Sequence, residues 1–259
     1  LGLLTADRDI GQDLVKVFNF FTGPSLDEQF RELLIAPVTM RERFTEYVRR
    51  EAERARDGER ARIVVKVNGL EDPEMVAELY RAGMAGVDVD LIVRDICRLR
   101  PGIEGVSDSI DVYSHVGRFL EHSRIFYFEN GGDPEYFVGS ADWMTRNLDY
   151  RVEAVAPVTD IDLRRQLRFV LELMLRDNRN CWEMRSDGTY EQRRAGPDEE
   201  IVDTHEVLME QVRRAKSDGG DRGIPAGYPI DTDLLVAPVE GSGSDEAAEA
   251  GADESAEAG

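Results

Sequence analysis

The amino-acid sequence predicts an α/β fold, a sandwich in which helices cover both faces of a mixed sheet. Two observations lead to this prediction. A strand–helix–strand unit runs from Ala61 to Arg94, and strands joined by a helix usually pair in parallel. A run of strands follows over residues 110–158, and the turn sequence Asn130–Asp133 lies inside it. Strands joined by such a turn form an antiparallel hairpin.

The N-terminal elements follow from hydrophobic spacing. Apolar side chains recur at helical intervals over residues 7–21, so we expect a helix there. The apolar run 33–37 indicates a short strand. A helix is then expected over residues 39–56, with Thr39 as its N-cap and Glu42 completing a capping box.

Residues 61–94 form the clearest unit. A strand is expected over 61–67 and a helix over 72–85, because Asp72 can cap it and proline follows at the first helical position. The next strand, residues 86–94, alternates apolar and polar side chains. The apolar set expected on one face is Val87, Val89, Leu91 and Val93.

The loop 95–107 separates this unit from the later elements. Short apolar runs predict strands over residues 110–116, 124–129, 135–139 and 151–158. Helical spacing predicts a helix over 160–176 and another within 197–216. The last part, 217–259, is expected to be a linker followed by a disordered acidic tail that is solvated and has no specific partner.

The charge of the chain is strongly acidic. It holds 53 Asp and Glu residues against 32 Lys and Arg, a net charge of −21, and only three of the basic residues are lysine. Such a surface suits high salt, where screening weakens repulsion between acids. A genome rich in G and C is the alternative reason for the low lysine content. By itself the charge argues against a polyanionic substrate.

The chain has no run of 18 apolar residues, so no transmembrane helix is expected. It begins Leu1-Gly2-Leu3-Leu4, without Met or a basic region, so we expect an internal part of a longer protein rather than a signal peptide. Two cysteines, Cys97 and Cys181, without metal-type spacing suit a reducing cytoplasm.

His122 is the candidate for chemistry among the three histidines. It directly precedes an apolar strand, and Arg124, two positions on, is expected on the same face. A histidine can transfer a proton or attack phosphorus, while an arginine holds phosphate oxygens. A structural role for His122 is the alternative. His115 is expected to be structural, and His205, in an acidic helix, to lie on the surface.

A second polar group follows in the segment 138–148. Its side chains supply a hydroxyl, a carboxylate and several donors, from Ser140, Asp142, Arg146 and Asn147. A carboxylate can orient a histidine through its second ring nitrogen, so Asp142 is expected to contact His122. The other groups can bind phosphate oxygens. A polar loop that caps the next element is the alternative.

The His-x-basic strand followed by Gly-Ser-x-Asp resembles half of the phospholipase D superfamily site. More closely, the chain is similar to the C-terminal part of type 1 polyphosphate kinases from Leu1 to about Trp182. The similarity lies in Leu3–Asp7, Val17–Asn19, Lys66–Pro73, Leu79–Ala82, Ala85–Val87, Leu91–Arg94, Leu99–Gly102, Gly117–Phe128, Gly139–Met144 and Arg146–Asp149.

The resemblance implies a phospholipase D-like α/β/α sandwich and a reversible transfer of the terminal phosphate of ATP to polyphosphate. Residues 1–23 then correspond to the terminal helix of a first lobe, and residues 33–216 to the second lobe. The phosphorylated histidine and the residues that bind magnesium are implied upstream of Leu1. ATP, ADP and polyphosphate are the implied partners, with no nucleic acid. The family also implies a homo-oligomer in the cytoplasm, with peripheral membrane association as an option.

The resemblance assigns two positions directly: His122 as the second essential histidine and Arg94 as an ATP contact. Arg124 is expected to neutralise phosphate charge, and Lys66 to face the polyphosphate path. A basic residue on an exposed strand face is the alternative for Lys66. With Arg146, these cations predict a basic tunnel inside an acidic shell. A phospholipase D-like phosphodiesterase or nuclease, or an inactive chain that needs a partner, are the alternative functions.

Overall fold

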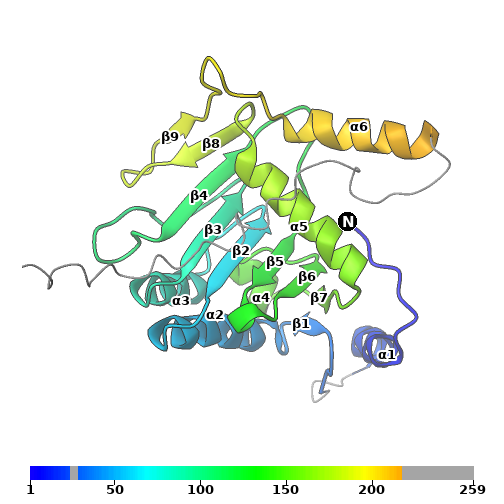
Figure 1. Ribbon diagram of the computed structural model, residues 1–259. Helices are drawn as coiled ribbons and strands as arrows, with labels where there is room; N and C mark the ends of the chain where they lie inside the picture. Colours follow the sequence, from blue (N-terminus) through cyan, green and yellow to red (C-terminus); the bar gives the residue numbers. More distant parts are fainter. Residues whose placement is uncertain (24–28, 218–259) are drawn as a thin grey trace, which may run out of the picture.

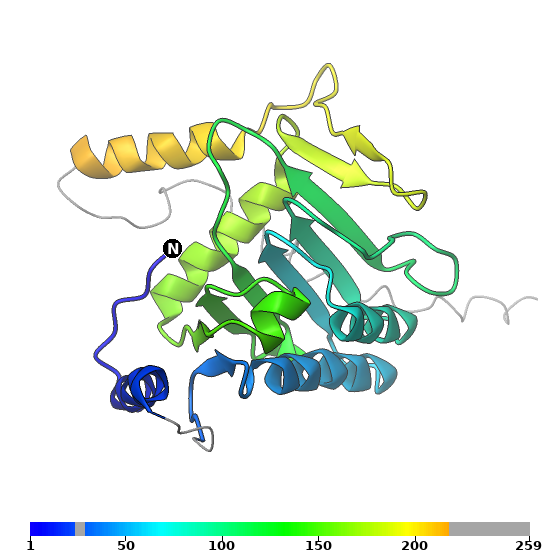
Figure 2. The same cartoon turned by 180° about the vertical axis from the view of Figure 1, so that it is seen from behind.

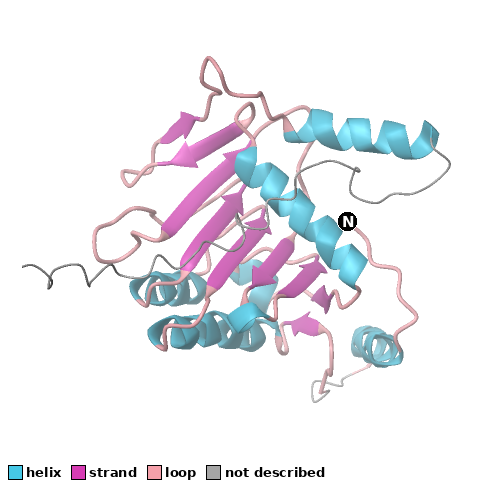
Figure 3. Ribbon diagram, viewed as in Figure 1, coloured by secondary structure: helices cyan, strands magenta, loops and turns pink. Residues whose placement is uncertain are grey.

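The computed structural model describes residues 1–23 and 29–217, which fold around one nine-stranded sheet (Figures 1 and 3). The strands are β1 (Leu34–Ala36), β2 (Arg62–Val67), β3 (Asp88–Val93), β4 (Ile110–His115), β5 (Ile125–Phe128), β6 (Glu135–Gly139), β7 (Glu153–Pro157), β8 (Cys181–Met184) and β9 (Tyr190–Gln192). The helices are α1 (Arg8–Thr22), α2 (Met40–Arg56), α3 (Pro73–Met84), α4 (Thr145–Asp149), α5 (Ile161–Arg176) and α6 (Thr204–Ser217).

The sheet is mixed, as the sequence predicts. Its strand order is β1-β7-β6-β5-β2-β3-β4-β8-β9. The pairs β2–β3 and β3–β4 are parallel, and every other neighbouring pair is antiparallel. The parallel pair β2–β3 comes from the helix-connected unit, as expected, whereas β3 and β4 are parallel across a loop without a helix. Among the antiparallel pairs, β5–β6, β6–β7 and β8–β9 follow one another in the chain, and β1–β7, β2–β5 and β4–β8 join strands that are distant in sequence.

Two helical layers cover the sheet, and the expected α/β/α sandwich is confirmed. Helices α2 and α3 pack on one face (Figure 2), where Phe44, Leu79 and the predicted inward face of β3 share one core. Helix α5 crosses the opposite face, and its Leu171 belongs to a second core together with Val64 of β2 and Tyr127 of β5. Because successive strand residues point to opposite faces, β2 contributes Val65 to the first core and Val64 to the second.

Helix α1 packs at the β1–β7 edge of the sheet. Its Ile10 and Val17 form a small core with Ile35 of β1. Asp13, fully buried on the same helix, accepts hydrogen bonds from the backbone N–H groups of residues 31, 32 and 33 at 2.8 to 3.0 Å. Burial alone raises the pKa of Asp13, but these donors outweigh it and hold the pKa below its usual value.

The expected start of α3 is confirmed, whereas the expected capping box of α2 is wrong. Asp72 Oδ1 accepts from Met75 N at 3.0 Å, with proline at the first helical position. Thr39 precedes α2 but makes no capping bond with its side chain. Its Oγ1 instead accepts from Ile35 N at 3.2 Å, because the chain turns back sharply between β1 and α2.

Three short elements were not expected: α4, β8 and β9. Helix α4 has five residues and strand β9 has three, too few for a periodic pattern. Strand β8 is expected from neither periodicity nor turn residues, and it pairs with β4 and β9 at the sheet edge. Among residues 1–23 and 29–217, no helix has the length and apolar character needed to cross a membrane. The predicted tail, apart from residue 217, lies outside the described residues.

Candidate active site

The candidate site lies at one end of the central strands of the sheet, where the ends of β2, β3 and β6 meet the start of β5. Lys66 near the end of β2 pairs with Ile92 of β3 and with Ile125 at the start of β5. Ile125 in turn pairs with Val138 near the end of β6. The residues that follow β2, β3 and β6, and those that precede β5, are therefore neighbours although they are far apart in sequence.

Arg124 joins His122 to Asp142. Its Nη1 lies 3.0 Å from His122 Nδ1 and also donates to the His122 carbonyl at 2.9 Å. Its Nε donates to Asp142 Oδ1 at 3.1 Å, and its Nη2 donates to Oδ2 at 2.9 Å. A guanidinium has only donors, so His122 Nδ1 must accept and its Nε2 carries the proton in the neutral ring. Nε2 is therefore a donor.

Asn68 extends this network to Arg94. Its backbone N and side-chain Nδ2 donate to Asp142 Oδ1 at 2.7 and 3.1 Å. Arg94 Nε then donates to Asn68 Oδ1 at 3.1 Å. The two positions implied by the resemblance, His122 and Arg94, are thus connected by an unbroken line of hydrogen bonds through Arg124, Asp142 and Asn68.

The line has a buried centre and accessible ends. Asp142 and Asn68 are buried, whereas His122 is exposed and Arg94 is half-buried. Burial alone raises the pKa of Asp142, but Arg124 and the donors of Asn68 outweigh it and keep the pKa below its usual value. The charged carboxylate of Asp142 therefore holds the guanidinium of Arg124 and the amide of Asn68 in place. The accessible ends of the line, His122 and Arg94, present N–H donors.

The expected contact between Asp142 and His122 is wrong. Both carboxylate oxygens of Asp142 bind Arg124, and Oδ1 also binds Asn68. Arg124 stands between the carboxylate and the histidine because its longer side chain, two residues beyond His122, reaches both groups. Asp142 therefore orients His122 indirectly, through Arg124.

The remaining polar residues of this segment lie apart from the line. Ser140 Oγ donates to Glu153 Oε2, and Asn147 Nδ2 donates to Glu153 Oε1 at 2.7 Å. Ser140 Oγ also accepts from Ala154 N at 3.2 Å, so these two side chains brace β7. Arg146 is exposed, and its Nη2 lies 3.8 Å from Met144 Sδ. Phosphate binding by Ser140, Arg146 and Asn147 stays a prediction.

Lys66 does not lie on an exposed strand face, so that alternative is wrong. Its side chain is 3% exposed, and its Nζ donates to the carbonyl of Ser123 at 2.9 Å and pairs with Glu121 at 3.1 Å. Burial lowers the pKa of Lys66, and Glu121 opposes that shift. Lys66 on β2 therefore binds the residues on both sides of His122, Glu121 and Ser123.

The expected surface position of His205 is also wrong. His205 is buried, and its Nε2 lies 3.2 Å from Glu121 Oε1. His115 is buried too, and neither ring nitrogen has a hydrogen-bond partner. Burial lowers the pKa of His115 to about 4, so its ring is neutral at neutral pH. This fits the expected structural role of His115.

Sequence reasoning did not assign roles to Asn68 and Glu121. Asn68 directly follows a buried strand, at the edge where polar residues collect, and this position was the available signal. Glu121 stands next to His122, but its partners Lys66 and His205 are more than fifty residues away in each direction. No local pattern indicates such a contact.

The described residues offer no ready site for magnesium. Within residues 1–23 and 29–217, no three His, Cys, Asp or Glu side chains converge as metal ligands. Asp142, the carboxylate at the centre of the line, is already bound to Arg124 and Asn68. This donor set does not fit a hard cation that prefers oxygen ligands.

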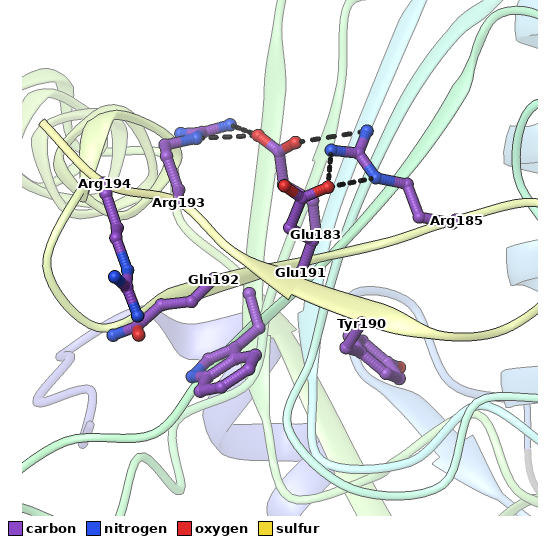
Figure 4. Close-up of a pocket in the computed structure, with 8 residues that line it drawn as sticks. Glu183, Arg185, Tyr190, Glu191, Gln192, Arg193 and Arg194 are labelled. Atoms are coloured by element: carbon purple, nitrogen blue, oxygen red, sulfur yellow. Dashed lines mark hydrogen bonds and ion pairs between the residues drawn. The ribbon is translucent and has the colours of Figure 1, made fainter. Parts of the chain in front are cut away.

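An open pocket of about 590 Å³ lies elsewhere, at strands β8 and β9 (Figure 4). Its charged side chains bind one another: Arg193 Nε donates to Glu183 Oε1 at 2.7 Å, and Arg185 Nε donates to Glu191 Oε2 at 3.1 Å. None of the predicted site residues lines this pocket. This pocket is therefore separate from the candidate site between His122 and Arg94.

Comparison with known proteins identifies the family of the chain. The family model for polyphosphate kinase C-terminal domain 2 matches residues 33–204. A polyphosphate kinase of Thermosynechococcus vestitus is 53% identical over 209 residues, which cover 81% of this chain and 29% of that protein. A polyphosphate kinase of Pseudomonas aeruginosa is 45% identical over 210 residues, covering 81% and 30%.

A solved structure shares the fold as well. The crystal structure of polyphosphate kinase from Porphyromonas gingivalis superimposes with a TM-score of 0.78 at 38% identity, covering 83% of this chain and 33% of that one. The chain thus spans about a third or less of the length of the proteins it matches. With a family model matched over most of its described residues, the chain belongs to the polyphosphate kinase family.

Proposed function

We propose that this chain contributes one side of a polyphosphate kinase active site, in which His122 and Arg94 contact the transferring phosphate and its nucleotide. The reaction is the reversible transfer of the terminal phosphate of ATP to polyphosphate. The bond from phosphorus to the ADP oxygen breaks, and a bond to the terminal oxygen of polyphosphate finally forms. A phosphohistidine supplied outside residues 1–259 carries the phosphate between the two steps, and magnesium is held there as well.

One observation carries the proposal: the hydrogen-bonded line from His122 to Arg94. Phosphoryl transfer needs little covalent help from the protein, so catalysis depends on positioned donors and cations. Arg124 holds His122 with Nε2 as the donor, and that proton can stabilise or pass to a phosphate oxygen. Asn68 holds Arg94 at the other end.

The net charge of −21 does not oppose this proposal. The strand ends bring Arg94, Arg124 and Lys66 to one edge of the sheet, next to the exposed His122. Asp142 and Glu121 offset the charges of Arg124 and Lys66, so a bound phosphate would meet Arg94 and oriented donors at short range, whereas bulk charge acts mainly on solubility and association. The acidic surface is then an adaptation to solvent, which we propose to be high salt.

The test uses a chimera in which this chain replaces the matching part of the Thermosynechococcus vestitus polyphosphate kinase. Polyphosphate formation from ATP is measured for His122→Ala and Arg94→Ala. We expect each to lower kcat/KM by about 100-fold or more, as removal of a positioned donor does. Arg98→Ala is the matched control, since Arg98 is an exposed arginine on the adjacent loop. Unchanged synthesis by His122→Ala contradicts the proposal.

A second measurement concerns the chain alone. Incubated with ATP labelled in its terminal phosphate and with magnesium, the isolated chain is expected to acquire no acid-labile phosphate. Strong labelling contradicts the claim that the phosphorylated histidine lies outside residues 1–259. Cleavage of a phosphodiester by the isolated chain instead favours the phosphodiesterase alternative.

A further inference from the structure

The segment 116–124, which carries His122 and Arg124, forms neither helix nor strand. It connects β4 to β5, and its residues 116–120 are exposed, including the apolar side chains of Val116 and Leu120. One backbone hydrogen bond, from Val116 N to the carbonyl of Asn180 at 3.1 Å, holds its start, and the position of the rest depends mainly on side-chain contacts. Arg124 holds its end through Asp142, and Glu121 makes a second set of contacts just before His122.

Glu121 bridges two buried basic groups. Its Oε2 lies 3.1 Å from Lys66 Nζ, and its Oε1 lies 3.2 Å from His205 Nε2. The side chains of Lys66 and His205 are 3% and 7% exposed, and that of Glu121 is 19% exposed. Burial raises the pKa of Glu121, but Lys66 and then His205 outweigh it and hold the pKa below its usual value. The bridge is therefore made by a carboxylate.

Both partners of Glu121 stand on fixed elements. Lys66 belongs to β2, which is paired on both sides by β3 and β5. His205 belongs to the first turn of α6, and Thr204 beside it donates through its backbone N to Asp177 Oδ2 at 2.9 Å. The start of α6 is thus attached to the end of α5, and the bridge connects the loop to two rigid supports.

The ring of His205 also packs directly on the loop backbone. A Cβ added at Gly117 would lie 2.7 Å from His205 Nδ1, so only glycine permits this approach. Phe119 N points at the same nitrogen at 3.4 Å. Because an N–H can only donate, Nδ1 accepts and Nε2 carries the proton that faces Glu121. This tautomer suits the carboxylate.

The bridge holds the chain on both sides of His122. Glu121 directly precedes His122. Ser123 directly follows His122, and its carbonyl accepts a hydrogen bond from Lys66 Nζ at 2.9 Å. We propose that Glu121 is a positioning residue for His122, because its links to Lys66 and His205 fix the segment that presents the histidine. The proposal rests on the proposed function of His122 and deepens it.

The expected effect follows from the cost of misplacement. Loss of the carboxylate leaves two buried basic groups without their acidic partner, which disfavours the observed course of the segment. Displacement of a reacting group by about 1 Å can lower a rate by about 100-fold. In the chimera we expect Glu121→Gln to lower kcat by that order, with the KM for ATP changed less than about threefold, because Arg94 lies on a different element.

The matched control is Glu51→Gln. Glu51, on α2, is a buried carboxyl group that accepts from Arg62 N and Asn130 N, next to the end of β2 that is far from Lys66. If Glu121→Gln only destabilised the fold, it would behave like Glu51→Gln, and its activity would fall in proportion to the amount of folded protein. We expect Glu51→Gln to keep the kcat of the folded fraction, whereas Glu121→Gln loses it.

A second measurement is independent of activity. In the 259-residue chain, hydrogen exchange of the amides in residues 116–124 is expected to become faster in Glu121→Gln and in His205→Gln, but to stay unchanged in Glu51→Gln. His205→Gln serves also where the Glu121 variant does not fold. A kcat of Glu121→Gln within about twofold of the unsubstituted chimera, or unchanged exchange in both variants, overturns the proposal.

The two proposals fail in different ways. If His122→Ala leaves synthesis unchanged, the proposed function of His122 is wrong, and a positioning role for Glu121 falls with it whatever the exchange shows. If His122→Ala abolishes synthesis while Glu121→Gln keeps full kcat, only the positioning role is wrong. Loss of kcat in both, with faster exchange in the Glu121 variant, supports both.

Discussion

The guanidinium of Arg124 binds the carboxylate of Asp142 through two parallel hydrogen bonds, of 3.1 Å from Nε and 2.9 Å from Nη2. This bidentate geometry fixes the plane of the guanidinium as well as its position. The remaining Nη1 then points at His122, whose Nδ1 it meets at 3.0 Å. The pair therefore determines which ring nitrogen of His122 carries the proton.

Breaking this pair is expected to be costly. The side chains of Arg124 and Asp142 are 11% and 7% exposed, and a buried charge that loses its partner costs about 3–5 kcal/mol. We expect Asp142→Ala to lower the free energy of unfolding by this amount, measured by urea denaturation. Exposed Asp162→Ala, which removes an ion pair with Arg165 on the surface of α5, is the control. Equal losses in the two variants contradict the prediction.

Asp13 is expected to hold α1 in a manner that depends on pH. Its carboxylate accepts from the backbone of residues 31–33, which keeps its folded pKa below the ordinary value of 3.8 despite burial. A lowered carboxyl pKa contributes stability above pH 3.8 that is lost as the pH falls through the folded pKa. Amide exchange in α1 is therefore expected to accelerate in acid in the unsubstituted chain.

Asp13→Ala provides the comparison for this experiment. It removes the acceptor at every pH and leaves three backbone N–H groups unsatisfied, each worth about 1–3 kcal/mol where buried. Its α1 amides should exchange fast at neutral pH, with no further step in acid from this carboxyl. Slow exchange of α1 in Asp13→Ala is the outcome that rejects this account of the helix.

His115 is expected to lower stability on the acid side of neutrality. Burial reduces its pKa from 6.5 to about 4, so between these values the unfolded chain binds a proton that the folded chain does not. The free energy of unfolding should therefore fall as the pH falls from about 6.5 to about 4. His115→Leu is expected to flatten this dependence. A ring resonance of His115 that titrates near 6.5 in the folded chain refutes the prediction.

The two cysteines are expected to react slowly. Burial raises the pKa of the Cys97 thiol to about 11 and that of Cys181 to about 12, from an ordinary 9.0. The thiolate is the reactive form, so alkylation of folded Cys97 by iodoacetamide should be about 100-fold slower than in denaturant. Mass spectrometry of each cysteine peptide measures both rates. Fast labelling of either thiol before unfolding speaks against the prediction.

The acidic charge is expected to make stability depend on salt. At a net charge of −21, repulsion between acids destabilises the folded chain, and screening at about 1 M KCl weakens it. We expect Tm to rise with salt. Removal of residues 240–259, which hold seven acids and no base, should preserve most of the effect, because the rest of the chain still carries −14. A Tm that falls with salt counts against adaptation to high salt.

Local patterns were sufficient for the elements that hold the site. Alternation in residues 86–94 predicted which side chains of β3 face α2 and α3, and Asp72 with its following proline predicted the start of α3. These features depend on residues a few positions apart, so sequence spacing carries them. His122 and Arg124 lie together as expected, but they meet in the loop before β5 and not on one face of a strand.

The partners of the site residues depended on the order of the strands. Asp142 lies 18 residues from Arg124 and 74 from Asn68, and Lys66 lies far from Glu121, yet these groups meet because β2, β5 and β6 are adjacent. The sequence by itself determined the mixed sheet and the family, and it singled out His122 as the candidate for chemistry. Only the tertiary structure decided that Arg124 stands between Asp142 and His122, and that His205 is buried, because both follow from contacts between distant strands and helices rather than from any local periodicity.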